Sequence, residues 1–293
     1  MTLSIATEQL AVRYGSTTAV EDLSISLGGG KIYGLLGRNG SGKTSMLQVL
    51  AGFRKAQGGH VLIDGQPVFD NPAVASQTCF IRESCDTVEH DFPQDRIKDA
   101  LAFAAATRPN WDGGYAETLV EKFKLVKKKR ISQLSRGQRS ALGIILGLAS
   151  RAPVTIFDES YLGMDAPSRY VFYDELLADF TEHPRTIVVS THLIEEVNAL
   201  FEEVVIIDEG RLVIHEEADV LRARGTTLVG PSDVVDQVAA GLTVLGEKRL
   251  GSTKSVTVYG ELDDALVTAA RGAGLELGPV PLQDLFVHLT GGS

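Results

Sequence analysis

Eight residues near the N-terminus constrain the fold of this chain most strongly. The mostly apolar run 31–36 predicts a buried strand, the segment Gly37-Arg38-Asn39-Gly40-Ser41-Gly42-Lys43-Thr44 follows it, and residues 44–51 have helical spacing. Two glycines that flank four residues and are followed by Lys and Thr form the pattern of a phosphate-binding loop. The segment therefore predicts a strand–loop–helix unit of an α/β fold, with the loop at the beginning of the helix.

The residue types in this loop match the chemistry of binding a nucleoside triphosphate. Glycines let backbone N–H groups surround a β-phosphate, and the positive end of the following helix favours the same anion. Lys43 would reach the β- and γ-phosphates, and Thr44 would bind Mg²⁺. The residues expected to bind ATP and Mg²⁺ here are Gly37, Asn39, Gly40, Ser41, Gly42, Lys43, Thr44 and Ser45.

A pair of carboxylates follows a second apolar run. Residues 154–157 predict a buried strand that ends at Asp158 and Glu159, and residues 186–190 form a similar run. Because open α/β sheets bind ligands at the carboxyl ends of their strands, Asp158 is expected to hold Mg²⁺ through water. Glu159 is expected to act as a general base toward the attacking water. An apolar run that ends in Asp-Glu is common by itself, so the preceding phosphate-binding loop gives the pair its significance.

The segment Leu134-Ser135-Arg136-Gly137-Gln138 resembles the signature motif of ABC ATPases, with Arg136 in place of the first of two central glycines. The resemblance implies that the motif begins a helix and binds the γ-phosphate of ATP held by a second subunit, through Ser135, Gly137 and Gln138. Ser135 would also be an ordinary helix N-cap. The position of the motif, about twenty residues ahead of the Asp-Glu pair, favours the functional interpretation.

Further positions match the same family. His192 resembles the switch histidine that contacts the γ-phosphate, and with Glu159 and Lys43 it completes the expected catalytic set. Asp165, in Gly163-Met164-Asp165, resembles a residue that contacts the phosphate-binding loop of the partner subunit. Tyr14 resembles the aromatic residue that stacks on adenine, although an ordinary strand aromatic in a half-buried sheet would look the same.

One position departs from the family pattern. The family has a glutamine that touches Mg²⁺ and the attacking water, and this chain has Glu83 at the corresponding place. A carboxylate suits Mg²⁺, which prefers hard oxygen ligands, but it adds negative charge beside Asp158 and Glu159. Glu83 is therefore a hypothetical metal ligand, in addition to Thr44 and Asp158.

The chain is expected to divide into a large and a small unit. Residues 1–224 would form a P-loop ABC-ATPase core of the α/β class, with a mixed sheet, antiparallel N-terminal strands within 3–27, and an inserted helical subdomain at about 84–150. Residues 225–293 would form a small α/β appendix that ends in a short tail helix near residues 281–287. The appendix strands are expected at 226–229 and 255–259, and its helices at 232–240 and 262–271.

Composition excludes several classes of protein. The 28 basic and 38 acidic residues give a net charge of −10, which argues against a general nucleic-acid binder. Cys79 and Cys85 have no cluster of further Cys or His around them, so reduced thiols are expected rather than a metal site or a disulfide. No signal peptide is visible, and no apolar run approaches the ~20 residues that span a bilayer. A membrane role would therefore require another polypeptide.

The resemblance covers about residues 2–220 and implies an ATP-hydrolysing subunit of an ABC transporter. ATP would be sandwiched in a dimer with a second copy or a paralogous subunit. The subclass it resembles is the bacterial single-cassette subunit that powers export of a drug, peptide or lipid-like compound through a separate membrane permease, from the cytoplasmic face of the membrane and without nucleic acid. The alternatives are a soluble ABC ATPase that acts on a ribosome or DNA, and a phosphate-loop kinase, which would leave residues 134–138 and His192 unexplained.

Overall fold

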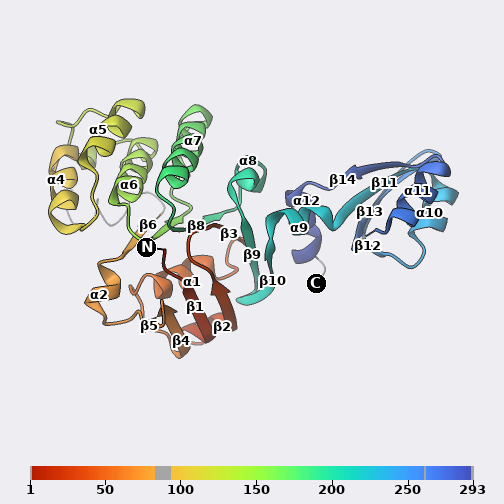
Figure 1. Cartoon of the computed structure of the whole chain (residues 1–293), viewed down its shortest axis with the longest axis horizontal. Coiled ribbons are helices and arrows are strands. Elements are labelled where there is room, and N and C mark those ends of the chain that lie inside the picture. Colours follow the sequence, from red (N-terminus) through yellow and green to blue (C-terminus); the bar gives the residue numbers. More distant parts are fainter. Residues whose placement is uncertain (1, 83–93, 261, 292–293) are drawn as a thin grey trace.

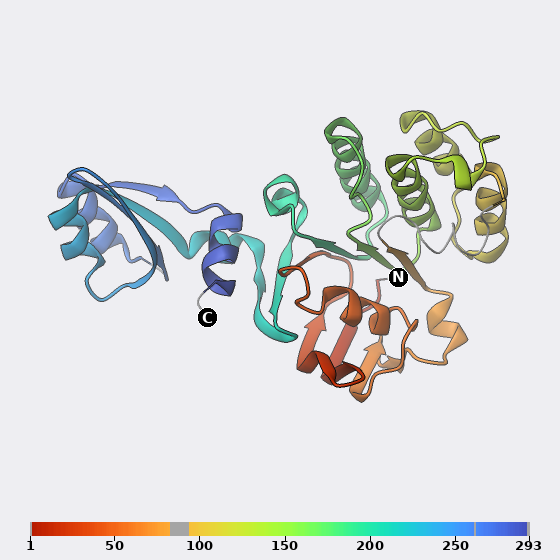
Figure 2. The ribbon, with the colours of Figure 1, turned by 180° about the vertical axis from the view of Figure 1, so that it is seen from behind.

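The computed structural model describes residues 2–82, 94–260 and 262–291, which form a large unit at one end of an elongated molecule and a small one at the other (Figures 1 and 2). The large unit is built on a six-stranded sheet in the order β10-β9-β3-β8-β7-β6. Every neighbouring pair from β9 to β6 is parallel, and β10 is antiparallel to β9. The strands are β3 (Ile32–Leu36), β6 (Thr78–Arg82), β7 (Val154–Asp158), β8 (Thr186–Thr191), β9 (Glu203–Asp208) and β10 (Arg211–Glu217).

Strands β3, β7 and β8 are buried at every residue, which explains why their sequences are continuous apolar runs without alternation. Their carboxyl ends lie at one edge of the sheet, so the residues that follow β3, β7 and β8 are brought together although they are far apart in the sequence.

A second, antiparallel sheet completes the N-terminal part of the large unit. Its order is β2-β1-β4-β5, from β1 (Ile5–Tyr14), β2 (Thr17–Leu27), β4 (Gly58–Ile63) and β5 (Gln66–Pro67). One face of β1 is buried through Ile5, Leu10 and Val12, and it shares a hydrophobic core with β3 and α1 (Lys43–Leu50). Helix α1, which begins within the glycine-rich segment, is therefore held by the two sheets together. A short helix, α2 (Pro72–Ala75), precedes β6.

A helical subdomain is inserted between β6 and β7. Its helices are α4 (Ile97–Thr107), α5 (Gly113–Lys122) and α6 (Arg136–Ser150), with a 3₁₀ turn at Ile131–Gln133. Helix α6 packs on the sheet at Gly147, where an added Cβ would lie 2.5 Å from the ring of Phe157. A glycine is needed here because the helix and β7 approach too closely for a side chain. The connection from β7 to β8 is α7 (Ala166–Glu182).

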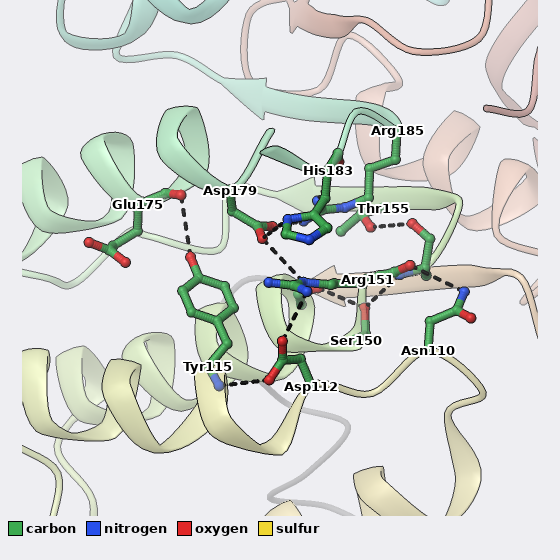
Figure 3. A network of polar contacts seen from close by, with 12 residues as sticks. Asn110, Asp112, Tyr115, Ser150, Arg151, Thr155, Glu175, Asp179, His183 and Arg185 are labelled. Carbon is green, nitrogen blue, oxygen red and sulfur yellow. Dashed lines mark hydrogen bonds and ion pairs between the residues drawn. The ribbon is translucent and has the colours of Figure 1, made fainter. Parts of the chain in front are cut away.

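A buried ion-pair network joins the helical subdomain to α7 and the β8 entry loop (Figure 3). Asp179 of α7 pairs with Arg185 at 2.6 Å and with Arg151 at 3.3 Å, and only 2% of the Asp179 side chain is exposed. Arg151, which ends α6 in a left-handed conformation, also pairs with Asp112 at 2.9 Å and stacks its guanidinium over Tyr115. One carboxylate of the α/β core and one of the helical subdomain thus share the same arginine.

The small unit has its own sheet and hydrophobic core. Its elements follow the order β-α-β-β-α-β of a split βαβ fold: β11 (Gly225–Pro231), α10 (Ser232–Ala239), β12 (Thr243–Leu250), β13 (Thr253–Tyr259), α11 (Asp264–Gly272) and β14 (Glu276–Pro279). The sheet order is β12-β13-β11-β14, with every pair antiparallel. Strands β12 and β14, which form the two edges of this sheet, have no counterpart in the sequence prediction, because neither alternates between apolar and polar residues.

The last helix returns to the large unit. Helix α12 (Leu282–Thr290) packs against α8 (Ile194–Val197), and Leu282 and Phe286 belong to the hydrophobic core of the large unit. Two further short segments complete this region, a 3₁₀ turn at Asn198–Leu200 and α9 (Ala218–Ala223). The tail helix therefore lies between the appendix and the helix that follows His192.

Candidate active site

The glycine-rich loop lies where the sequence predicts it, between β3 and the first turn of α1. Gly40 and Gly42 have φ angles of 84° and 101°, which side chains rarely adopt. A Cβ on Gly37 would lie 2.3 Å from the Ser41 hydroxyl, and one on Gly42 would lie 2.3 Å from the Ala19 carbonyl oxygen. Glycine is therefore required at these three positions for the backbone to follow the path of the loop.

Lys43 turns back into the loop from the first residue of α1. Its ammonium donates to the carbonyl oxygens of Gly37 at 2.7 Å and of Arg38 at 3.2 Å, and lies 3.7 Å from the Glu159 carboxylate. Burial lowers the pKa of Lys43, while the nearby carboxylates of Glu159 and Asp158 raise it. The ammonium is thus a largely desolvated charge at the place where phosphates would bind.

Asp158 is the last residue of β7 and is almost completely buried. Its carboxylate accepts a hydrogen bond from the Ser190 hydroxyl at 2.5 Å, and another from Thr44. Burial raises the pKa of Asp158, against the effect of these two hydrogen bonds and of Lys43. A divalent cation would relieve this penalty by supplying positive charge.

The oxygens of Asp158 and Thr44 fit a magnesium ion. Mg²⁺ is commonly held by one or two carboxylates together with substrate phosphates and water, rather than by a cage of protein ligands. Within the described residues no group of three or more His, Cys, Asp or Glu is arranged for a metal. Glu83, the third predicted ligand, lies outside the described residues.

Glu159 occupies a strained position at the turn after β7. Its φ of 47° is unusual for a residue with a side chain. The strand β8 holds this backbone, because the Glu159 N–H donates to the Ser190 hydroxyl at 3.1 Å. The carboxylate lies 3.2 Å from His192 Nδ1. The structure thus brings the three predicted catalytic side chains, Lys43, Glu159 and His192, into one cluster.

The segment 134–138 begins a helix, as the resemblance implies. Ser135 is the N-cap of α6 and forms a capping box with Gln138: its hydroxyl accepts from the Gln138 N–H at 3.2 Å, and its own N–H donates to the Gln138 side chain at 3.3 Å. Both interpretations of Ser135 are therefore compatible with this geometry, because a capping hydroxyl at a helix N-terminus can also face an anion.

The segment 134–138 packs against the loop that ends at Asp165. A Cβ on Gly137 would lie 2.8 Å from the Gly163 carbonyl oxygen, and a Cβ on Gly163 would lie 2.7 Å from the Arg136 side chain. The Arg136 side chain, which replaces a glycine of the family motif, therefore lies against Gly163. A pocket of about 410 Å³ is lined by Ser135, Arg136, Gly137, Gln138, Gly163, Met164 and Asp165, among others.

Asp165 caps the next helix and is exposed beside this pocket. Its carboxylate accepts from the Ser168 N–H at 3.0 Å, and hydrogen bonds from Ser168 lower its pKa.

A second pocket, about 470 Å³ in volume, lies beside the phosphate-binding loop and is lined by residues 38–41, Asp208, Glu209, Thr290 and Gly291. The two pockets share no lining residue.

Tyr14 lies beside α1, one turn beyond the loop. Its hydroxyl accepts from Ser45 at 3.3 Å and donates to Gln48 at 3.4 Å, and the guanidinium of Arg54 lies 3.9 Å from the ring centroid. Because Arg54 covers one face of the ring, only the other face could stack on a base. The adenine-stacking role of Tyr14 stays a prediction.

Ser190 is a site residue that the sequence analysis does not identify. It contacts both Asp158 and Glu159, because the parallel register places Asp158 opposite Ser190. The neighbouring Thr191 accepts a hydrogen bond from the buried Tyr161 hydroxyl. In the sequence, Ser190 and Thr191 are only two hydroxyl residues at the end of an apolar run. Their place in the site can be inferred only once β7 and β8 are known to be neighbouring strands.

Comparison with known proteins identifies the family. Residues 20–161 match the family model described as ABC transporter. The chain is 30% identical over 234 residues to the doxorubicin resistance ATP-binding protein DrrA of Mycobacterium tuberculosis, covering 76% of this chain and 68% of the relative. It is 28% identical over 299 residues to the Nod factor export ATP-binding protein I of Burkholderia pseudomallei, covering 97% of this chain and 96% of the relative.

Solved structures share the fold. The structure described as an ATP binding subunit of an ABC transporter superposes with a TM-score of 0.64 at 20% identity, over 74% of this chain and 91% of that one. No helix within the described residues is long and apolar enough to cross a membrane. The chain therefore belongs to the family of ABC transporter ATP-binding proteins.

Proposed function

We propose that this chain hydrolyses ATP and thereby powers export through a separate membrane permease. The observation that carries the proposal is the convergence of Lys43, Glu159 and His192 next to the buried Asp158, which Thr44 contacts. The relatives named for doxorubicin resistance and Nod factor export support the direction of transport. A drug, peptide or lipid-like cargo fits these names, and the cargo pocket would lie in the permease.

The residues of the cluster divide the chemistry. Lys43 exchanges the carbonyl oxygens of the loop for β- and γ-phosphate oxygens, which compensates its desolvated charge. Asp158 and Thr44 would hold Mg²⁺, which would neutralise phosphate charge. Glu159 orients the attacking water and accepts its proton, and His192 beside it contacts the γ-phosphate.

A second subunit completes the site in this proposal. Ser135 and Gly137 lie at the N-terminus of α6, in a pocket that shares no residue with the one at the phosphate-binding loop. A helix N-terminus favours an anion, so these groups serve the γ-phosphate held by another copy or by a paralogous subunit. Closure of the dimer would bring both halves onto one ATP.

The helical subdomain offers a surface for the permease. A groove of about 270 Å³ between α4 and α5 is lined by Leu101, Ala105 and Trp111, with Lys98 and Lys127 beside them. Trp111 also packs against the core of the subdomain, so it has a structural role as well. An amphipathic helix of the permease on the cytoplasmic face of the membrane could place apolar side chains in this groove.

The test uses the purified chain and a variant of the proposed base. The wild-type chain is expected to release phosphate from ATP in the presence of Mg²⁺, and Glu159→Gln to lose nearly all turnover while retaining ATP. Size-exclusion chromatography is expected to show an ATP-dependent dimer of Glu159→Gln. Co-purification from membranes, with mass spectrometry, would identify the permease. If the wild-type chain hydrolyses ATP while both it and Glu159→Gln remain monomeric with ATP, the composite site is contradicted.

A further inference from the structure

Arg169 connects two loops of the active site through one guanidinium. Its Nη1 donates to the Met164 carbonyl oxygen at 2.9 Å, in the loop that leads to Asp165. Its Nε and Nη2 bind both carboxylate oxygens of Glu196 at 2.8 and 2.7 Å. Glu196 lies in α8, four residues after His192. The loop before α7 and the segment after β8 are therefore tied to each other by three hydrogen bonds.

The geometry of Arg169 is fixed from both sides. Its backbone N–H donates to the Asp165 carbonyl oxygen at 3.0 Å, in the first turn of α7. One turn later, Tyr173 donates its hydroxyl to the same Glu196 carboxylate at 3.1 Å. The side chains of Arg169 and Glu196 are only 19% and 27% exposed. A bidentate guanidinium–carboxylate pair with a further carbonyl bond has far less freedom than a single exposed ion pair.

A second brace lies deeper between the same two segments. The buried Tyr161 hydroxyl donates to Thr191, which in turn accepts from the Leu193 N–H at 2.8 Å. Tyr161 also packs edge-on against the ring of Tyr173, with 5.7 Å between centroids. The turn after Glu159 and the turn before His192 are thus connected by the Tyr161–Thr191 hydrogen bond as well as by the contacts of Arg169.

We propose that Arg169 and Glu196 are positioning residues for ATP hydrolysis, which fix His192 relative to the loop of Asp165. The proposal rests on the ATPase function proposed above. Neither side chain belongs to the Lys43–Glu159–His192 cluster, so neither acts on the phosphates. Their effect is to make α8 and the 163–165 loop move as one piece, so that a partner docking on Asp165 also sets the distance between His192 and Glu159.

The same connection extends to the C-terminal helix. Helix α12 packs against α8, and Phe286 and Leu282 lie in one hydrophobic cluster with Ile194 and Val197. The appendix therefore contacts the helix that Arg169 holds. Movement of the appendix would reach His192 through α8.

The test compares conservative variants with a control ion pair on the same helix. Arg169→Lys keeps the charge but cannot make the two-pronged contact together with the carbonyl bond, and Glu196→Gln keeps the shape but removes the charge. The combined exchange Arg169→Glu with Glu196→Arg restores opposite charges. Lys122→Gln removes an ion pair to Glu175, in the middle of α7 and outside the active site.

The expected result is a split between turnover and binding. Arg169→Lys and Glu196→Gln should lower kcat by about tenfold to a hundredfold, as a small misplacement of catalytic groups does. The KM for ATP should remain near that of Lys122→Gln, because the phosphate-binding loop is untouched, and both variants should stay folded at the assay temperature. The exchange variant should recover part of the lost kcat.

Amide hydrogen exchange supplies a readout that does not depend on turnover. In Arg169→Lys, exchange should rise both near Met164 and along 194–197, and Lys122→Gln should leave both segments unchanged. Wild-type kcat in both conservative variants, or a loss of kcat that only follows a loss of melting temperature, would overturn the inference. A wild-type chain without ATPase activity would instead overturn the proposed function and this role with it.

Discussion

Replacing Asp179 by Asn is expected to destabilise the joint between the helical subdomain and the α/β core. The side chains of Asp179 and Arg185 are 2% and 4% exposed, and Arg185 Nη2 lies 2.6 Å from Asp179 Oδ2. Removing the charge leaves the Arg185 guanidinium buried without its counter-ion, which costs about 3–5 kcal/mol. Arg151 keeps its pair with Asp112, so we expect the lower end, about 3 kcal/mol, or a melting temperature lower by roughly 6–12 °C.

The single tryptophan makes this prediction measurable. Trp111 directly precedes Asp112 in the network region, so its fluorescence during urea unfolding reports on this joint. The matched control is Lys127→Gln, whose ion pair to Glu117 lies within the helical subdomain with side chains 45% and 54% exposed, and should contribute about 0–1 kcal/mol.

A double variant separates the charge from the contact. Asp179→Leu with Arg185→Leu removes both buried charges, and replacing a buried pair by apolar residues is often nearly neutral. It should therefore be more stable than Asp179→Leu alone. If Asp179→Asn unfolds within about 1 kcal/mol of wild type, like the exposed control, the network does not hold the joint.

Three other predictions address packing, pH and the site. Gly147→Ala should cost about 1–3 kcal/mol in urea unfolding, because its Cβ would overlap the Phe157 ring; Gly114→Ala, on exposed α5 surface, is the control. A hydrogen bond from Arg169 lowers the pKa of Glu196, so the pair stabilises the fold above the ordinary glutamate pKa and this contribution disappears as pH falls through the lowered value. The stability gap between wild type and Glu196→Gln should therefore narrow in acid, and a gap constant with pH would contradict this. Glu83→Gln and Glu83→Ala should both change the ATPase rate; wild-type rates in both would exclude a role for Glu83.

The phosphate-binding loop and the start of helix α6 were predictable from the sequence, because each depends on residues that lie close together in the chain. The glycines of the loop indicate positive φ angles, which the structure has at Gly40 and Gly42. The Glu209-Gly210 turn between β9 and β10 is equally local, with φ of 46° and 78°. Ser135 followed three residues later by Gln138 is a capping box in sequence and in structure.

The appendix shows where local patterns fail. The strands predicted at 226–229 and 255–259 are present as parts of β11 and β13, and the second of them alternates between polar and apolar residues. Strand β12 carries Gly246, Glu247, Lys248 and Arg249 and has no apolar face of its own, since it pairs with β13 at an open edge. Pairing with a neighbour, rather than its own residue pattern, makes this segment a strand.

The sequence alone determined the phosphate-binding loop, the carboxylate pair and the order of the motifs, because each follows from residues within a few positions of one another. Only the tertiary structure decided which of them meet. The register of β7 against β8 places Ser190 on Asp158, and the packing of α7 against α8 places Arg169 on Glu196. Such contacts join residues about thirty positions apart, and strand order and helix packing, rather than spacing along the chain, set their geometry.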